Sequence, residues 1–350
     1  MLTLLHKYDR VRKYWLIDSG IITESNKEFR FPQPGLSMQF NARYPTIRYS
    51  SATQIGIYNH PDLLLIDRTN YDIKDTISIP EGLTLYEMQE THFVCMRRVN
   101  DDLKQVVVLD RNRNVVNESI ALPVWLPYFT NGRIIYTTET TARHLSGYSF
   151  QENKELFSID MKRLTNTEDA HLSGEVYIQD DRAIFCISNS YGTDYATFIL
   201  DINTGEIIEK IALFRSTYLY DGKIYDVDQR EFKCYDISSR ELIRYNLTSL
   251  FAADNLVMTG SPYVIFENKL YFSAVPEGNS LISGYIGIIN LITWQLEWRY
   301  ELLIEPEKGS FIDNRYSVTS MQVNNNLLAI HCAGNTLFVF DKNNTTPQYS

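Results

Sequence analysis

The chain has 350 residues and a net charge of −10, with 33 Lys and Arg against 43 Asp and Glu. This acidic balance excludes a general affinity for nucleic acid, because binding to phosphates requires an excess of Lys and Arg. Aromatic residues make up 13% of the chain and favour β-strands, since aromatic side chains pack well on pleated sheets.

The N-terminal segment MLTLLHKYDRVRKYW has a short apolar run followed by charged residues. A secretory signal peptide needs a longer apolar core, and no stretch of the sequence reaches the length of a membrane-spanning helix. We therefore expect a cytoplasmic protein without a membrane partner. Residues 18–43, which include Pro32, Pro34 and Gly35, are interpreted as a connector.

From residue 65 onward, an apolar pair closed by Asp or Asn and followed by a turn recurs along the chain. A short polar side chain at this marker position can accept hydrogen bonds from backbone N–H groups about two residues further on. We expect the markers to hold the turn between the third and fourth strands of each unit rather than to form a catalytic site. The seven markers are Asp67, Asp110, Asp160, Asp201, Asp236, Asn290 and Asp341.

Residues 216–248 show the repeating unit most clearly, as four short apolar or aromatic runs separated by turn residues such as Asp221-Gly222. Residues 223–227 and 232–235 alternate with period two, which indicates strands. Units of about 40 to 55 residues are typical of propeller blades. The predicted fold is all-β, a seven-bladed β-propeller of four-stranded antiparallel blades. Its innermost strands are expected near 44–49, 83–88, 124–129, 174–179, 215–220, 262–267 and 318–323.

The last unit has only three strand patterns, so its outer strand must come from elsewhere. We expect the N-terminal segment, through either residues 2–6 or residues 11–17, to supply this strand. Such a strand closes the ring and removes an exposed sheet edge. The expected organisation is one domain over residues 1–350, with a closing strand in 1–17, a connector at 18–43, seven blades at 44–341 and a tail at 342–350.

Two turns carry a resemblance to a known family. Asp201-Ile-Asn-Thr-Gly205-Glu206 and Asn290-Leu-Ile-Thr-Trp-Gln-Leu-Glu-Trp298 are similar to the Asp-x-x-Thr-Gly-Lys-x-x-Trp pattern that closes the blades of quinoprotein (PQQ)-like propellers. The repeats also resemble WD-like propellers, without their Trp-Asp and Gly-His signatures. The resemblance implies the fold but not the chemistry, because the adjacent Cys pair of the quinone enzymes is missing and no residues match their calcium site. We therefore expect no cofactor.

Cysteine and histidine residues give no metal-ligand spacing. The four Cys stand singly in apolar runs, which predicts buried free thiols. His60, His144 and His171 are expected in solvated loops, and His331 is expected as a hydrogen-bonded interior residue, so no metal site is predicted. The Cys positions are Cys95, Cys186, Cys234 and Cys332.

Three acids, Glu87, Glu175 and Glu267, lie in or near the predicted innermost strands. A converging acid and base there would suit a hydrolase or lyase that acts on a sugar or lactone at the channel mouth. The acids occupy different strand positions and hence different depths. An enzyme is therefore the alternative interpretation, and no catalytic residue is assigned.

Long insertions are predicted only between second and third strands and between blades, at 138–155, 164–173, 188–195, 249–262, 275–285 and 303–316. Most of the net charge of −10 is expected on these loops, together with exposed aromatic side chains. Aromatic anchors within an acidic rim are typical of an interface for a basic protein. The predicted binding residues are Tyr148, Phe150, Tyr191, Asp194, Tyr195, Phe251, Asp254, Glu277, Tyr285, Glu305, Glu307 and Phe311.

The sequence thus favours a non-enzymatic, monomeric propeller that captures a basic protein partner. Some bacterial propellers with irregular repeats resemble immunity proteins that neutralise a cognate toxin, and an acidic chain without a leader fits that role. An adjacent toxin-like reading frame is the observation that would support this hypothesis.

Overall fold

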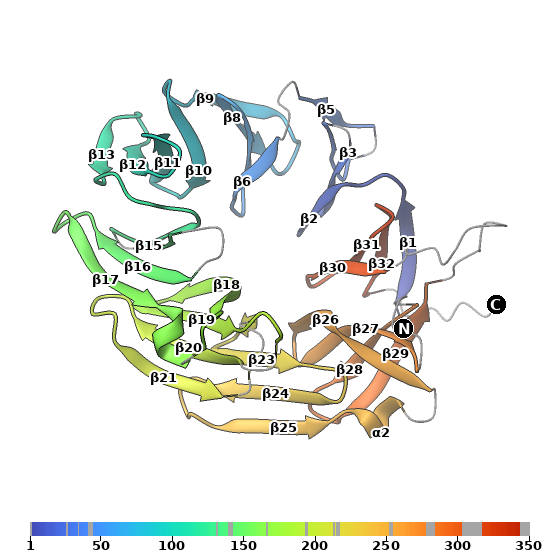
Figure 1. Cartoon of the computed structure of the whole chain (residues 1–350). Helices are drawn as coiled ribbons and strands as arrows, with labels where there is room; N and C mark the ends of the chain where they lie inside the picture. Colours follow the sequence, from blue (N-terminus) through green and yellow to red (C-terminus); the bar gives the residue numbers. More distant parts are fainter. Residues whose placement is uncertain are drawn as a thin grey trace. The chain divides into compact units, whose positions relative to one another are not determined.

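Eight four-stranded antiparallel sheets make up the described part of the chain in this computed structural model (Figure 1). We call each sheet a blade. Short helices α1 (Met161–Thr165) and α2 (Thr248–Phe251) are added to them. The all-β class is confirmed, and the predicted number of seven blades is wrong. The structure describes residues 2–343 except positions 26, 34, 41–44, 131, 139–142, 166, 193–194, 213, 215–217, 252–254, 278–283, 303–316 and the side chain at 175.

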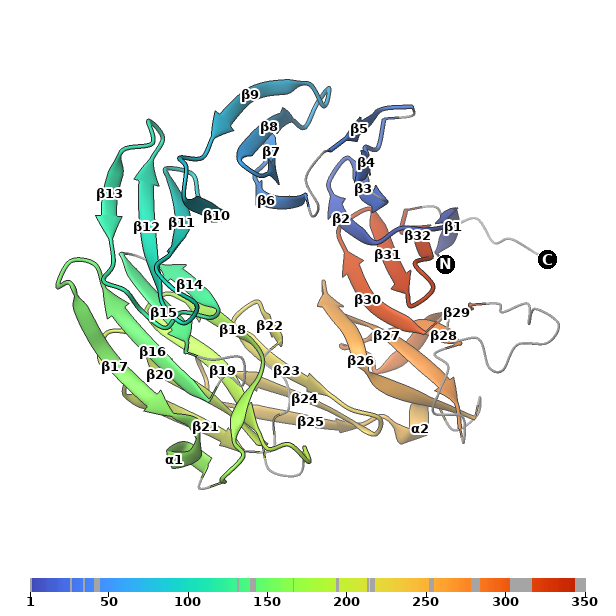
Figure 2. The same cartoon turned by 45° about the horizontal axis from the view of Figure 1, so that its top comes forward.

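The chain divides into two compact units, and one of them is formed by Asn41–Leu219. It contains blades 2 to 5, whose strands lie side by side in chain order (Figure 2). The strands are β6 (Thr46–Ser50), β7 (Gln54–Asn59), β8 (Asp62–Asp67) and β9 (Ile73–Ser78) in blade 2; β10 (Leu83–Met88), β11 (His92–Arg98), β12 (Lys104–Asp110) and β13 (Val115–Glu118) in blade 3; β14 (Pro127–Thr130), β15 (Arg133–Thr137), β16 (His144–Ser149) and β17 (Lys154–Asp160) in blade 4; and β18 (His171–Gln179), β19 (Arg182–Ser188), β20 (Tyr195–Asp201) and β21 (Ile207–Ala212) in blade 5.

The other unit is formed by Met1–Phe40 together with Tyr220–Ser350, and the boundary falls within strand β22. It contains blades 1, 6, 7 and 8. The strands are β2 (Lys13–Ile17), β3 (Gly20–Ser25), β4 (Glu28–Arg30) and β5 (Ser37–Gln39) in blade 1; β22 (Tyr218–Tyr220), β23 (Lys223–Val227), β24 (Glu231–Asp236) and β25 (Leu242–Asn246) in blade 6; β26 (Leu256–Phe266), β27 (Lys269–Pro276), β28 (Tyr285–Asn290) and β29 (Gln295–Glu301) in blade 7; and β30 (Val318–Val323), β31 (Leu327–Cys332), β32 (Leu337–Asp341) and β1 (Thr3–Tyr8) in blade 8.

Residues 18–43 are not the predicted connector, because they contribute three strands of blade 1. Ile22 and Phe29 are fully buried there. Strands β4 and β5 have three residues each, which is too short to show an alternating pattern. The error of one blade arises here, since β2, which the sequence offers as a possible closing strand, is the first strand of blade 1.

The outer strand of blade 8 comes from the N-terminus. Strand β1 pairs antiparallel with β32, from Thr3 opposite Asp341 to Tyr8 opposite Leu337. Of the two segments considered, the one at residues 2–6 therefore completes the last sheet, as predicted. Because β32 also pairs with β31, both of its edges are hydrogen-bonded. The organisation as a single domain stays a prediction.

The hydrophobic core of each unit lies between consecutive blades. Leu65 of blade 2 packs with Leu85 and Cys95 of blade 3, and Ile288 of blade 7 packs with Phe340 of blade 8. Second and third strands are buried on both faces, so they are almost continuously apolar, whereas outer strands such as β9 are largely exposed. The four Cys are buried free thiols on β11, β19, β24 and β31, which confirms their predicted burial.

The marker residues hold turns as predicted. Each accepts a hydrogen bond at 2.7–2.9 Å from a backbone N–H two residues further on, or four for Asp110. Two markers do not lie between a third and a fourth strand as predicted. Asp341 ends β32, whose outer partner β1 comes from the N-terminus, and Asp160 ends β17, the fourth strand of blade 4. The third strand, β16, reads HLSGYS and has no apolar alternation. The predicted loop at 138–155 is therefore wrong, since β16 lies within it.

Four marker turns share a left-handed residue four positions after the marker. These residues are Tyr71, Gly205, Arg240 and Trp294, with φ between 54° and 76°. Their N–H groups donate to the marker carbonyl oxygens at 2.8–2.9 Å. Only Gly adopts this backbone without strain. At Trp294, stacking on Tyr245 with ring centroids 3.8 Å apart offsets part of the cost.

Candidate functional site

An open cleft of about 460 Å³ lies on the innermost strands of blades 2 to 5. Residues 47–48 of β6, 86–87 of β10, 127–129 of β14 and 176–178 of β18 line it. The predicted innermost strand at 83–88 agrees with β10. First strands of four blades thus bring side chains that are far apart in the sequence to one place.

Two β-bulges place the central side chains of this cleft. In blade 2 the register passes from Ile47 to Tyr49, which leaves Arg48 as the extra residue. In blade 3 it passes from Leu85 to Glu87, which leaves Tyr86 as the extra residue. Bulges redirect side chains and occur often beside functional sites. The Arg48 guanidinium lies over the Tyr86 ring, 5.6 Å from its centroid, as a cation–π contact.

Arg48 carries an unsatisfied donor. Its Nε atom is buried and has no hydrogen-bond partner, and among the residues that the structure describes no ion pair joins Arg48 to a carboxylate. A buried polar group left without a partner costs roughly 1–3 kcal/mol. Arg48 is not among the residues predicted from the sequence. The available signal is a charged residue between Ile47 and Tyr49 in an innermost strand.

Glu87 is the one inner-strand acid that the structure places in this cleft. It is half-buried and accepts a hydrogen bond from Gln89 Nε2 at 3.4 Å. Burial raises the pKa of Glu87, and the Gln89 hydrogen bond only partly opposes this. Glu267 belongs to the other unit, exposed in the β26–β27 turn and 3.8 Å from Lys342. The side chain of Glu175 lies outside the described residues.

Aromatic and apolar groups form the remaining walls. Tyr128 and Phe129 of β14 lie in the cleft lining with Tyr177 of β18. The hydroxyl of Tyr128 accepts a hydrogen bond from the Val176 backbone N–H at 3.4 Å, which ties blade 4 to blade 5 at this point. The described lining of the cleft therefore combines one cation and one acid with several aromatic residues.

Three of the predicted binding aromatics are buried, so their expected exposure is wrong. Tyr148 is fully buried on β16, and its hydroxyl donates to the Asn153 side chain. Phe150 packs against the Tyr148 ring with centroids 5.6 Å apart. Phe251 in α2 packs edge-on against Phe272 at 5.2 Å. Aromatics near strand ends fold into the space between blades because this removes their large apolar area from water.

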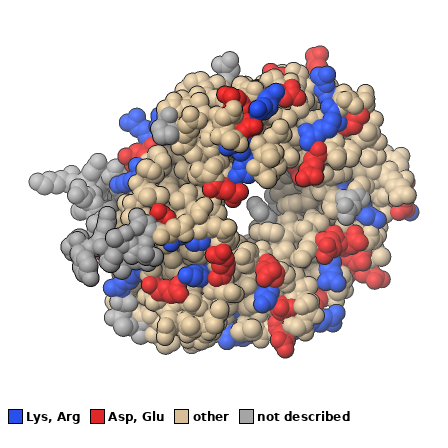
Figure 3. All heavy atoms as spheres, turned by 180° about the vertical axis from the view of Figure 1, so that it is seen from behind, with Lys and Arg blue, Asp and Glu red and all other residues tan. Residues whose placement is uncertain are grey.

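The other predicted binding residues have varied positions. Tyr191, between β19 and β20, is 85% exposed, and Glu277 is exposed after β27. Tyr195 and Tyr285 are half-buried at the starts of β20 and β28. Figure 3 shows a face on which Asp and Glu lie interspersed with Lys and Arg. Outside the described residues lie Asp194, Asp254, Glu305, Glu307 and Phe311.

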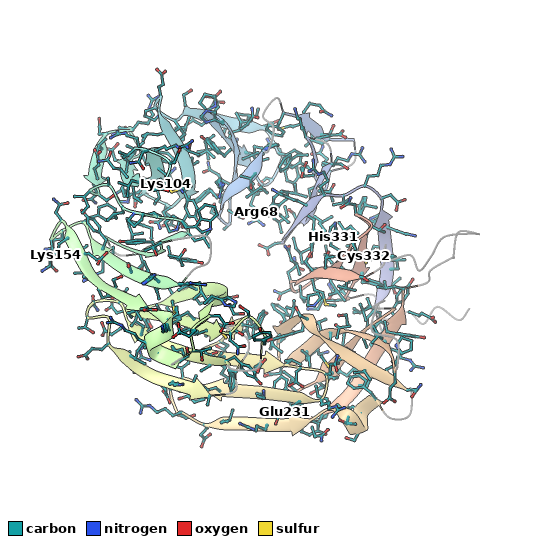
Figure 4. All side chains as sticks on the ribbon, viewed as in Figure 1. Arg68, Lys104, Lys154, Glu231, His331 and Cys332 are labelled. Atoms are coloured by element: carbon teal, nitrogen blue, oxygen red, sulfur yellow. The ribbon has the colours of Figure 1, made fainter. Side chains whose placement is uncertain are left out.

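The described histidines do not form a metal centre. No group of three or more His, Cys, Asp or Glu side chains in the described ranges has metal-binding geometry. His331 on β31 (Figure 4) has both ring nitrogens hydrogen-bonded, Nδ1 to the Thr319 hydroxyl at 3.0 Å and Nε2 to the Val11 carbonyl oxygen at 2.7 Å. Its predicted role is confirmed. His144 and His171, expected in solvated loops, are instead half-buried at the starts of β16 and β18. Within the described chain no helix is long and apolar enough to span a membrane.

Neither a protein-family model nor a curated protein sequence matches the chain. Solved structures do match. The computationally designed Ika8 protein has a TM-score of 0.59 at 9% identity, over 97% of this chain and 98% of that one. BamB from Moraxella catarrhalis has a TM-score of 0.56 at 12% identity, over 97% of this chain and 100% of that one. Sqt1 from Saccharomyces cerevisiae has a TM-score of 0.57 at 9% identity, over 97% of this chain and 99% of that one.

These similarities define the class of the protein as a β-propeller with four-stranded antiparallel blades. The described residues form eight such blades. At this identity the comparison shows the fold alone. Trp298, the last residue of the PQQ-like pattern, is buried in the core shared by blades 7 and 8, with its ring centroid 5.5 Å from that of Phe340.

Proposed function

We propose that this propeller is a non-enzymatic scaffold that binds a protein partner. The binding surface is formed by the loops between second and third strands and between blades in the unit of blades 2 to 5. The observation that carries the proposal is the exposure of large apolar side chains on these loops. Tyr191 is 85% exposed, and Trp125 is 47% exposed. Exposed aromatics of this kind serve as anchors at protein interfaces.

More apolar surface lies beside Trp125. Val99, between β11 and β12, and Ile120, between β13 and β14, are each about half exposed. The two loops are joined by the backbone hydrogen bonds between Lys104 and Leu122, and the Lys104 ammonium lies 5.3 Å from the Trp125 ring centroid. Side chains on neighbouring loops are therefore held together and can contact one partner.

Exposed acidic side chains on the same loops favour the binding of a basic partner. The side chains of Asp101 and Glu168 are 87% and 83% exposed. They form ion pairs with Arg98 and Lys162, respectively. Exposed pairs contribute little to stability, so cations of a partner can replace these local ones. Such acids chiefly increase the rate of association and its dependence on salt.

The test compares loop variants with a control in affinity capture followed by titration. The double variant Trp125→Ala and Tyr191→Ala should reduce affinity for the captured protein by about tenfold or more, since anchor truncations commonly cost roughly 2 kcal/mol. Ile73→Ala and Val115→Ala, exposed apolar residues on the outer strands β9 and β13, provide the control. Equal titration curves for both double variants would contradict the proposal.

A role in immunity against a cognate toxin stays a prediction, as do the cytoplasmic location and the monomeric state. The enzymatic alternative would need a second carboxylate beside Glu87, and the described lining of the cleft contains none. Turnover of a sugar or lactone that Glu87→Gln abolishes would favour it.

A further inference from the structure

The cleft on β6, β10, β14 and β18 has a donor that protein atoms leave unused. The Nε atom of Arg48 is buried without a hydrogen-bond partner, and the bulge at this residue redirects the side chain from the regular pleat. The planar guanidinium group binds carboxylate and phosphate oxygens in a fork of parallel hydrogen bonds. Because Nε itself is closed to solvent, an anionic oxygen in the cleft would bind the terminal Nη groups of the same guanidinium.

The walls around Arg48 suit an apolar or aromatic body rather than a bare ion. Tyr86 holds the guanidinium by a cation–π contact, and Tyr128, Phe129 and Tyr177 are among the other lining residues. A volume of about 460 Å³ falls within the roughly 300–1,000 Å³ typical of small-molecule sites. Such sites are mostly apolar, with a few polar groups that orient the ligand.

From this arrangement we propose that the cleft binds a small organic anion. Its carboxylate or phosphate group contacts Arg48, and its apolar or aromatic body packs between Tyr86 and the rings of β14 and β18. Glu87 lies in the same lining and, when ionised, disfavours anions. The site is therefore expected to hold anions more tightly in a Glu87→Gln variant. This proposal is independent of the loop surface proposed for a protein partner.

Calorimetric titration of the full chain with benzoate, phenyl phosphate and benzamide tests the proposal. Benzoate and phenyl phosphate should bind saturably. Benzamide has a similar shape without the charge, and it should bind at least about tenfold more weakly. Arg48→Gln should weaken both anions by about tenfold or more, because a hydrogen bond to a charged group is lost. Benzamide binding as tightly as benzoate would overturn the proposal.

Two further variants separate binding from folding. Arg97→Gln removes an arginine of the same unit that pairs with Glu118 at 2.7 Å outside the cleft, and it should leave anion affinity unchanged. Glu87→Gln should tighten benzoate binding at neutral pH, a gain that a damaged fold does not produce. The assignment to this cleft would be refuted if Arg97→Gln lost as much anion affinity as Arg48→Gln. It would also be refuted if Glu87→Gln did not bind benzoate more tightly than wild type.

Discussion

At the scale of single residues, the marker turns explain how a repeat with little sequence identity keeps its geometry. The Asp201 carboxylate accepts the N–H groups of Asn203 and Thr204 at 2.7 and 3.1 Å. Gly205 then takes a left-handed backbone at φ 76°. In this turn the glycine has a second role, because Phe157 of the preceding blade packs directly over it.

We predict that Gly205→Ala is strongly destabilising. A Cβ atom at this position would lie 2.5 Å from the Phe157 Cβ atom, so the blades must shift in addition to the left-handed strain of about 1–2 kcal/mol. Gly222→Ala is the matched control, since Gly222 has φ 69° but no atom within 4 Å of an added Cβ. Chemical denaturation should show a clearly larger loss of unfolding free energy for Gly205→Ala. Equal losses would contradict the role of Phe157.

A second prediction at this scale concerns how the raised pKa of Glu87 affects stability at different pH. Burial raises it above the usual value of 4.5, so the folded state favours the protonated acid. The associated stability is present below the unfolded-state pKa and is lost as pH rises through the folded-state pKa. Glu87→Gln should therefore raise the melting temperature at pH 7 relative to wild type, with little change at pH 4.

The control for this pH dependence is Glu81→Gln, which changes an exposed acid just before β10. It should not alter the difference in melting temperature between pH 4 and pH 7. The other ionisable side chains that line the cleft with Glu87 are Arg48, Tyr86, Tyr128 and Tyr177. A Glu87→Gln variant that keeps the wild-type pH profile would show that Glu87 does not carry the effect.

At the scale of elements, the N-terminal strand β1 protects a sheet edge. It pairs with β32 over residues 3–8, with Leu5 as the extra residue where the register shifts. An unpaired β32 would offer free N–H and C=O groups to other chains. Just beyond β1, the Val11 carbonyl oxygen accepts a hydrogen bond from His331 of the neighbouring strand β31, so this segment is also anchored beyond the edge pairing.

Deletion of residues 1–9 should therefore lower the melting temperature and cause aggregation. Residues 13–17 must be kept, because they form β2 of blade 1. Leu5→Ser is the control, since Leu5 is 41% exposed and lies at the register shift; its effect should stay within about 0.5 kcal/mol. Calorimetry and light scattering provide the measurements. A truncated protein that is monomeric and melts like wild type would show that β1 is dispensable.

At the scale of the whole molecule, the same blade geometry recurs in proteins that share 9–12% of their residues with this chain. Blades tolerate this divergence because each one needs only apolar faces on its middle strands and turns that reverse the chain. Function therefore depends on what the loops and innermost strands carry. The features on which the two proposals rest are the exposed side chains around Trp125 and the bulged Arg48.

The sequence by itself determined the features that a few neighbouring residues encode. The marker turns are hydrogen bonds within five residues, and strands such as β10 and β30 show their alternation directly, so both were predictable. The middle strands are apolar because both of their faces are buried. This pattern was enough to indicate four-stranded repeats and a last blade that lacks its own outer strand.

Only the tertiary structure decided which weak strands exist and which side chains are buried. The three-residue strands β4 and β5 have no period of their own and form because the blade pairs them. Tyr148 and Phe251 are anchors of the core rather than of a surface, because neighbouring blades close over them. The bulges that bring Arg48 onto Tyr86 depend on the register between strands, a long-range property that local sequence does not encode.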